Sequence, residues 1–90
     1  MRRILTSNRF KKDLEIAKKR QLDLILLEEV VVILAKGEEL PKACKDHPLK
    51  DALLGLRECH IKPDWLLIYS IDDNELELFL IRTGTHSDLF

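Results

Sequence analysis

The chain is poor in cysteine, glycine, proline and aromatic residues, with 2 Cys, 3 Gly, 3 Pro and 6% Phe, Trp and Tyr among its 90 residues. Two cysteines exclude a disulfide-rich scaffold, and in a reducing compartment we expect both thiols to remain free. Neither charge is in clear excess, because the formal net charge is −1. Proteins that bind duplex nucleic acids usually carry a clear positive excess, so any contact with RNA has to come from a local patch.

An apolar run long enough to cross a bilayer is also missing. The longest candidate, residues 24–35, is interrupted by Glu28 and Glu29, so we expect no membrane-spanning helix and no membrane partner. The basic residues at the N-terminus are not followed by the apolar segment of a secretion signal, which favours a cytoplasmic location. The composition, 46% hydrophobic and 34% charged, is typical of a globular protein, and the length predicts one domain spanning residues 1–90.

The N-terminal part predicts a short strand followed by a basic amphipathic helix. Residues 3–6 suit a strand, and Ser7 or Asn8 offers a side-chain oxygen that can cap the helix that follows. The apolar stripe of this helix consists of Phe10, Leu14 and Ala17. Residues 1–20 contain eight Lys or Arg residues and two acidic ones. Such a charge run is usually soluble surface, and it is also a local patch able to meet phosphates.

A second helix is predicted for residues 22–35. Its β-branched runs also suit a buried strand, but fourteen residues exceed the usual strand length. Asp23 can cap its start, and Gly37 can end it in a left-handed conformation. The two helices then form a hairpin whose apolar faces pack against each other and a sheet.

The rest of the chain predicts a loop and three strands. Residues 38–50 contain two prolines and few apolar residues and are predicted as a loop, whereas strands are predicted at residues 53–61, 65–71 and 75–82. Short connections make these three strands an antiparallel meander. The predicted fold class is therefore α+β.

Polar groups are concentrated in residues 57–65, which contain an imidazole, two carboxylates and the only tryptophan. Alternate side chains of a strand share a face, so Glu58 and His60 are predicted on one surface and Cys59 on the other. A polar strand edge with a satisfied histidine is the simpler interpretation of this segment alone, since clustered titratable groups only sometimes mark function.

The meander adds groups from the C-terminus to this segment. It is predicted to place Asp64 or Trp65 opposite Arg82, with His60 one strand away and His86 just beyond Arg82. Histidines, acids and an arginine together suit cleavage of RNA without a metal ion. One group removes the proton of a ribose 2′-hydroxyl, a cation stabilises the phosphate, and an acid protonates the departing 5′-oxygen.

Aromatic and metal-binding alternatives remain. Trp65 and Phe90 can each stack on a base, although core packing also fits Trp65 because it begins an apolar strand. The zinc-type ligands are Cys44, His47, Cys59 and His60. Neighbouring strand residues point to opposite faces and do not readily share one tetrahedral ion, so we expect no metal site and no cofactor.

Three segments closely resemble the YafQ-like branch of the RelE/ParE superfamily of bacterial toxins: DHPL at 46–49, RECHIKPDWLLIY at 57–69 and RTGTHSDLF at 82–90. The resemblance extends over essentially the whole chain. It implies a RelE-like α+β fold, in which an N-terminal strand and a helical hairpin pack on a twisted, mostly antiparallel sheet. It also implies the toxin of a type II toxin–antitoxin system, a ribosome-dependent mRNA endoribonuclease that a cognate antitoxin neutralises.

The resemblance assigns roles to individual residues. The positions that match the family's catalytic residues are His47, His60, Asp64 and His86. Among them, His86 is expected to be the general acid, and Asp64 or His60 the base or orienting group. Substrate contacts are expected from Glu58, Trp65, Arg82 and Phe90. The segment 2–20 is the candidate contact with ribosomal RNA.

A function of another class fits the same superfamily. ParE-like toxins are not nucleases and act by binding a protein. Those relatives generally lack this set of acid–base residues, so the set favours the nuclease. A structural partner of a larger assembly is a third hypothesis.

Overall fold

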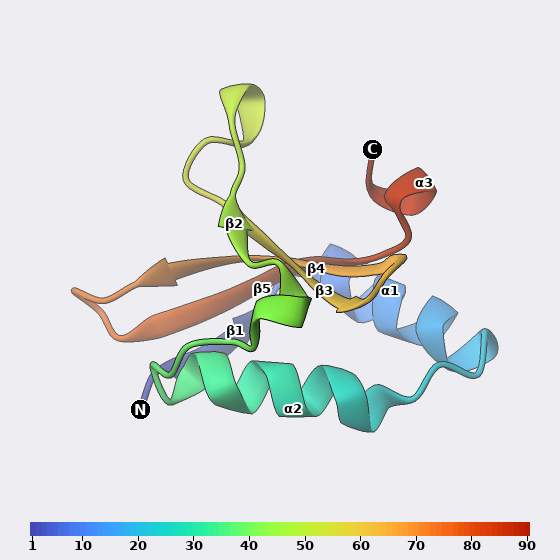
Figure 1. Cartoon of the computed structure of the whole chain (residues 1–90), viewed down its shortest axis with the longest axis horizontal. Coiled ribbons are helices and arrows are strands. Elements are labelled where there is room, and N and C mark those ends of the chain that lie inside the picture. Colours follow the sequence, from blue (N-terminus) through green and yellow to red (C-terminus); the bar gives the residue numbers. More distant parts are fainter.

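The structure is a computed structural model that describes residues 1–90. Its centre is a five-stranded sheet with the strand order β1-β5-β4-β3-β2. Helices α1 (Asn8–Lys19) and α2 (Leu24–Ala35) lie against one face of this sheet. The short helix α3 (His86–Leu89) and the loops around β2 (His47–Pro48) stand on the other face, which we call the outer face (Figure 1). This arrangement confirms the predicted α+β fold.

The sheet contains one parallel and three antiparallel pairs of neighbouring strands. β1 (Arg3–Thr6) is parallel to β5 (Glu77–Gly84), whereas β4 (Trp65–Asp72) lies antiparallel between β5 and β3 (Arg57–Lys62), and β3 also pairs with β2. The last pair of β1 with β5 is Thr6 with Leu80. Residues 81–84 of β5 therefore form a free strand edge.

Both long helices begin at predicted caps. The Ser7 hydroxyl accepts a hydrogen bond from the N–H of Phe10, and the Asp23 carboxylate accepts one from the N–H of Ile25. α2 begins two residues later than predicted, because the turn between the helices includes Gln21 in a left-handed conformation (φ 59°). Gly37 follows α2 with φ 78°, as predicted. No helix is both long and apolar enough to span a bilayer.

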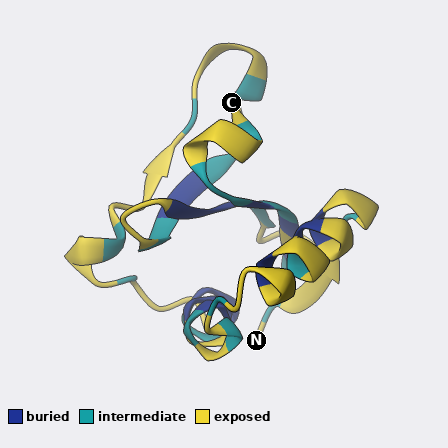
Figure 2. Ribbon diagram, turned by 90° about the vertical axis from the view of Figure 1, so that its right-hand side faces the viewer, coloured by how far each residue is buried: buried dark blue, intermediate teal, exposed yellow.

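The core lies between the sheet and the two long helices, where Figure 2 shows the buried residues facing one another. On the sheet its members include Cys59, Trp65, Leu67, Tyr69, Leu78 and Leu80, and on the helices Phe10, Leu27 and Leu34. Leu66 and Ile68 of β4 are buried as well, but strand alternation puts them on the outer face. Both cysteines are free thiols.

Two element predictions are only partly correct. The strand predicted at residues 53–61 begins only at Arg57, because Asp51–Leu53 form a 3-10 turn, η2, and Gly55 adopts φ 93°. The predicted loop 38–50 contains a 3-10 turn, η1 (Lys42–Cys44), and the short strand β2.

The predicted register of β4 and β5 is wrong. Arg82 pairs with Ile68 rather than with Asp64 or Trp65. The connection between the strands extends through Leu76, which adopts a left-handed conformation (φ 53°), and a bulge at Ile68/Tyr69 shifts the pairing by one more residue.

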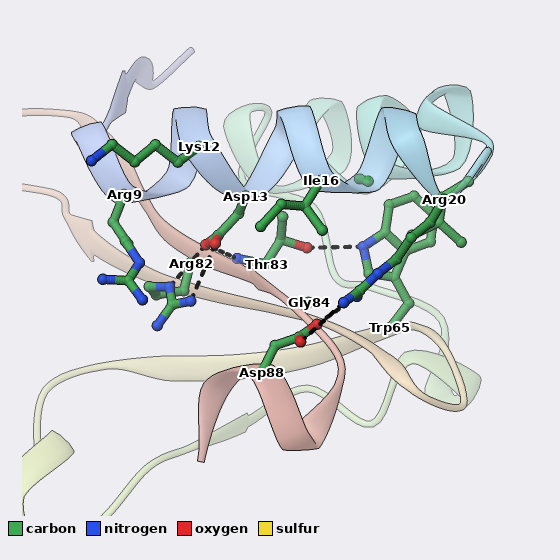
Figure 3. A pocket seen from close by; sticks show the side chains of 12 residues that line it. Arg9, Lys12, Asp13, Ile16, Arg20, Trp65, Arg82, Thr83, Gly84 and Asp88 are labelled. Atoms are coloured by element: carbon green, nitrogen blue, oxygen red, sulfur yellow. Dashed lines mark hydrogen bonds and ion pairs between the residues drawn. The ribbon is translucent and has the colours of Figure 1, made fainter.

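A buried carboxylate joins α1 to the free edge of β5. The side chain of Asp13 accepts hydrogen bonds from Nε and Nη2 of Arg82, at 2.8 and 3.1 Å, and from the N–H of Thr83, at 3.1 Å (Figure 3). Asp13 is 5% exposed. The bonds therefore hold α1 in place where β1 no longer pairs.

We expect Asp13→Ala to lower the free energy of unfolding by about 3 kcal/mol, because it leaves a guanidinium and a buried N–H without their acceptor. Urea unfolding followed by circular dichroism measures the change. Glu15→Ala removes an exposed acid from the same helix and is expected to cost less than about 0.5 kcal/mol. Equal losses in both variants would contradict this account.

Candidate active site

Strand pairing arranges residues of the outer face in two rows. The first row consists of His47, Glu58, Ile68 and Arg82, and the second of His60, Leu66 and Gly84. Directly paired residues of an antiparallel sheet project their side chains to the same side. The buried Leu66 and Ile68 form an apolar floor, and the polar side chains of β2 and β3 stand beside it.

The Glu58 carboxylate is the centre of the polar group. Its side chain is only 6% exposed, and its Oε1 lies 3.6 Å from Nε2 of His47 and 3.8 Å from Nε2 of His60. Both distances exceed a normal hydrogen bond, so the contacts are electrostatic. The placement of Glu58 and His60 on one face, with Cys59 on the other, confirms the alternation predicted from the sequence.

Helix α3 brings the third imidazole to this group. The rings of His86 and His60 have centroids 5.8 Å apart. Asp64, in the β3–β4 turn, accepts hydrogen bonds from the N–H of His86 at 3.1 Å and from its ring Nδ1 at 2.9 Å. These bonds hold the pKa of Asp64 below its usual range. At neutral pH Asp64 is therefore an ionised acceptor and a weak base.

The three imidazoles share one hydrogen-bond pattern. Nδ1 of His47 lies 2.7 Å from the carbonyl oxygen of Lys45, Nδ1 of His60 lies 3.1 Å from that of Pro63, and Nδ1 of His86 meets Asp64. Carbonyl oxygens and ionised carboxylates only accept, so every Nδ1 donates its proton. When the rings are neutral, each Nε2 then carries a lone pair, and those of His47 and His60 face the Glu58 carboxylate. Such an arrangement of lone pairs beside a carboxylate is suited to binding a metal ion.

A metal ion has a suitable set of ligands here. Glu58, His60 and His86 each offer one ligand atom, and these atoms lie within 4.8 Å of one another. Two imidazoles and a carboxylate suit Zn²⁺, and metal-binding histidines commonly donate their other N–H to a carbonyl or carboxylate. Sequence analysis did not consider this set. The cysteine that it did consider, Cys59, lies on the core side, where burial raises the pKa of its thiol to about 12.

The other predicted residues lie outside the group or at its rim. The guanidinium of Arg82 does not join the imidazoles, because Asp13 binds it at the edge of β5. Trp65 is 3% exposed and its indole N–H donates to the Thr83 hydroxyl at 3.0 Å. Its predicted stacking on a base does not agree with this burial, and core packing is the correct alternative. Phe90 is 60% exposed at the rim, with its ring 6.5 Å from that of His86.

Two carboxylates that support the imidazole cluster from outside were not predicted from the sequence. Asp46 accepts hydrogen bonds from the Tyr69 hydroxyl and from the Arg57 guanidinium, and so fixes the backbone beside His47. Asp13 falls three residues after Phe10, within the apolar stripe of α1. A carboxylate at a core-facing helical position was the available signal for it.

Comparisons with known proteins match nearly the whole chain to one family. A family model described as "Bacterial toxin of type II toxin-antitoxin system, YafQ" matches residues 2–90. The mRNA interferase toxin YafQ of Escherichia coli strain B is 41% identical over 85 residues, which cover 93% of this chain and 90% of the relative.

Two solved structures have the same fold. A metal-bound toxin from Helicobacter pylori is 52% identical, with a TM-score of 0.94 and 100% of both chains covered. A chain of the E. coli DinJ-YafQ complex is 41% identical, with a TM-score of 0.91, 100% of this chain and 99% of that chain covered.

Proposed function

Because the chain belongs to the YafQ family of toxins of type II toxin–antitoxin systems, we propose that it is an endoribonuclease that cleaves mRNA on the ribosome. The observation that carries this proposal is the gathering of three imidazoles and two carboxylates beside an apolar floor. The name of the E. coli relative, an mRNA interferase, supports the same substrate.

The proposed reaction uses the 2′-hydroxyl of the RNA as its nucleophile. His60 removes the hydroxyl proton through Nε2, and O2′ attacks the phosphorus. His86 enters this step as the imidazolium, with its Nδ1–H bonded to Asp64. The P–O5′ bond breaks, and His86 transfers the proton of its Nε2 to the leaving O5′. The products are a 2′,3′-cyclic phosphate and a 5′-hydroxyl, and the balance of the step requires no water.

The neighbouring groups set up this proton transfer. Asp64 is a weak base in this position, so its role is to orient His86 with Nε2 free for the substrate. Glu58 faces His60 and stabilises the imidazolium that forms when this ring takes the proton. His47, half-exposed beside Glu58, is the cation available to the phosphate when its ring is protonated. Phe90 at the rim is exposed for stacking on a base.

Binding to ribosomal RNA is proposed for the basic surface of α1. Arg9 and Lys12 line a hollow of about 390 Å³ between α1, β5 and α3 (Figure 3). Neither takes part in a salt bridge, whereas Arg20 and Arg82 in the same hollow are paired with acids. Their charges are therefore free for phosphates.

A cognate antitoxin is the other proposed partner, supported by the DinJ-YafQ complex of the relative. Ribosomes and mRNA place the proposed activity in the cytoplasm. The protein-binding mode of ParE-like toxins is the alternative, and the acid–base group argues against it.

We expect His86→Ala to slow mRNA cleavage at least a hundredfold, since a general acid contributes roughly 10²- to 10⁴-fold. Mapping of mRNA 5′ ends in a reconstituted translation reaction measures the cleavage. Ser87→Ala, an exposed neighbour in α3, is the control and should cleave normally. Cleavage by His86→Ala at the wild-type rate refutes the assignment, and growth arrest by the wild type with intact mRNA would favour the ParE-like alternative.

We expect the double variant Arg9→Ala/Lys12→Ala to bind ribosomes roughly tenfold more weakly at physiological salt, because two phosphate contacts are lost. The cleavage rate at saturating ribosome concentration should not change. Lys36→Ala/Lys50→Ala removes the same charge from exposed positions outside α1 and serves as the control. Equal weakening in both double variants would mean that only net charge matters.

Reversible inhibition by a transition-metal ion is a second candidate function, favoured by the Glu58-His60-His86 ligand set and by the metal-bound state of the H. pylori toxin. The ion would occupy the ring nitrogens through which His60 is proposed to accept a proton and His86 to donate one. We expect Zn²⁺ to stop cleavage and a chelator to restore it. In calorimetric titrations His60→Ala should bind Zn²⁺ at least tenfold more weakly, and Cys44→Ser should bind it normally. The reverse order of affinities would exclude this ligand set.

A further inference from the structure

The segment that carries His86 has little apolar anchoring. Within Thr85–Phe90 no residue is fully buried, and only Thr85 and Leu89 are half-buried. A helix of four residues is not stable by itself. The position of the His86 ring therefore depends on the polar contacts that hold α3.

These contacts act on two sides of α3. On one side, Asp64 binds the backbone and the ring of His86. On the opposite side, the Asp88 carboxylate accepts hydrogen bonds from Nη1 of Arg20 at 2.6 Å and Nη2 at 3.2 Å, as well as from the N–H of Thr85 at 2.9 Å (Figure 3). The Arg20 and Thr85 bonds hold the pKa of Asp88 well below its usual range, so this carboxylate stays ionised wherever the protein is folded and active.

Arg20 extends from a fixed position. It is the C-terminal cap of α1, with its N–H bonded to the carbonyl of Ile16. The preceding turn is anchored by Ala17, which is buried against the sheet. The guanidinium therefore reaches α3 from the helical layer, across the free edge of β5.

Gly84 permits this close approach. A Cβ added at this position would lie 2.9 Å from both Cβ and Oδ2 of Asp88. A larger residue at position 84 would displace Asp88 from Arg20, because real Cβ atoms do not approach this closely.

We propose that Arg20 is a positioning residue of the active site, whose paired hydrogen bonds to Asp88 hold α3 so that His86 stays against Asp64 and beside His60. This inference rests on the proposed nuclease function and extends it to a residue that does not touch the reacting groups. An exposed ion pair contributes little to global stability. Its loss therefore changes the fraction of molecules with α3 docked much more than the fraction that is folded.

The test compares Arg20→Gln, Arg20→Lys and Lys36→Gln in the full chain. Hydrogen exchange of the His86 amide, measured by NMR, reports the bond to Asp64 without any activity assay. In Arg20→Gln we expect this exchange to rise, and the cleavage rate at saturating ribosome concentration to fall, each by roughly fivefold. Arg20→Lys should restore part of both effects. Lys36→Gln, an exposed control with the same change of charge, should show neither.

Gly84→Ala provides a second variant, in which Arg20 is retained but Asp88 is displaced. It should reproduce the Arg20→Gln exchange and cleavage effects while amides of β4 keep their protection. The proposal would be overturned if the His86 amide exchanged at the wild-type rate in Arg20→Gln. It would also be overturned if weaker ribosome binding were the only defect of this variant. If the wild type cleaves no mRNA, the nuclease proposal fails, and the exchange measurements still decide whether Arg20 positions His86.

Discussion

Burial of β4 on both of its faces is the constraint on which the other features depend. Trp65, Leu67 and Tyr69 pack against the helices, while Leu66 and Ile68 face the opposite side and are also buried. Because side chains alternate along a strand, a slip of one residue would exchange the core side chains of β4 with those of the apolar floor on the outer face. β3 and β5 pair with β4 in this register. The polar side chains of β3 therefore lie beside an apolar surface.

The outer face of the sheet concentrates basic atoms around the buried Glu58 carboxylate. Every imidazole has its Nδ1 proton directed outward to a carbonyl or carboxylate, so the remaining nitrogens provide lone pairs. The electrostatic field of this arrangement favours positive charge at its centre. The proposed proton transfer and the proposed metal binding use the same ring nitrogens, so one would exclude the other.

Local patterns predicted the local structure well. Ser7, Asp23 and Gly37 mark helix ends through their own chemistry, and the alternation in β3 separates Glu58 from Cys59. The resemblance to the toxin family named the imidazoles that the fold brings together. The register of β4 and β5 was not predictable in the same way, because it depends on a left-handed Leu76 and on a bulge, neither of which has a sequence signal.

Long-range pairing explains the other failures. Arg82 was expected at a phosphate, yet it is bound by Asp13, 69 residues away in the chain. Arg20 and Asp88 are separated by 68 residues, and each looks like ordinary soluble surface when viewed alone. Only the path of β5 between α1 and α3 brings such partners together. The burial of Trp65, in contrast, could be predicted locally, because this residue begins an apolar strand.

Because α3 has few buried contacts, the position of its imidazole and the stability of the core can change independently. The last six residues place an imidazole beside His60 but contribute no fully buried side chain, so changes confined to this tail can remove the imidazole without removing core contacts. The altered protein would keep its core, with the surfaces of α1 and α2 intact. Loss of the imidazole and loss of the fold are therefore separate events in this molecule.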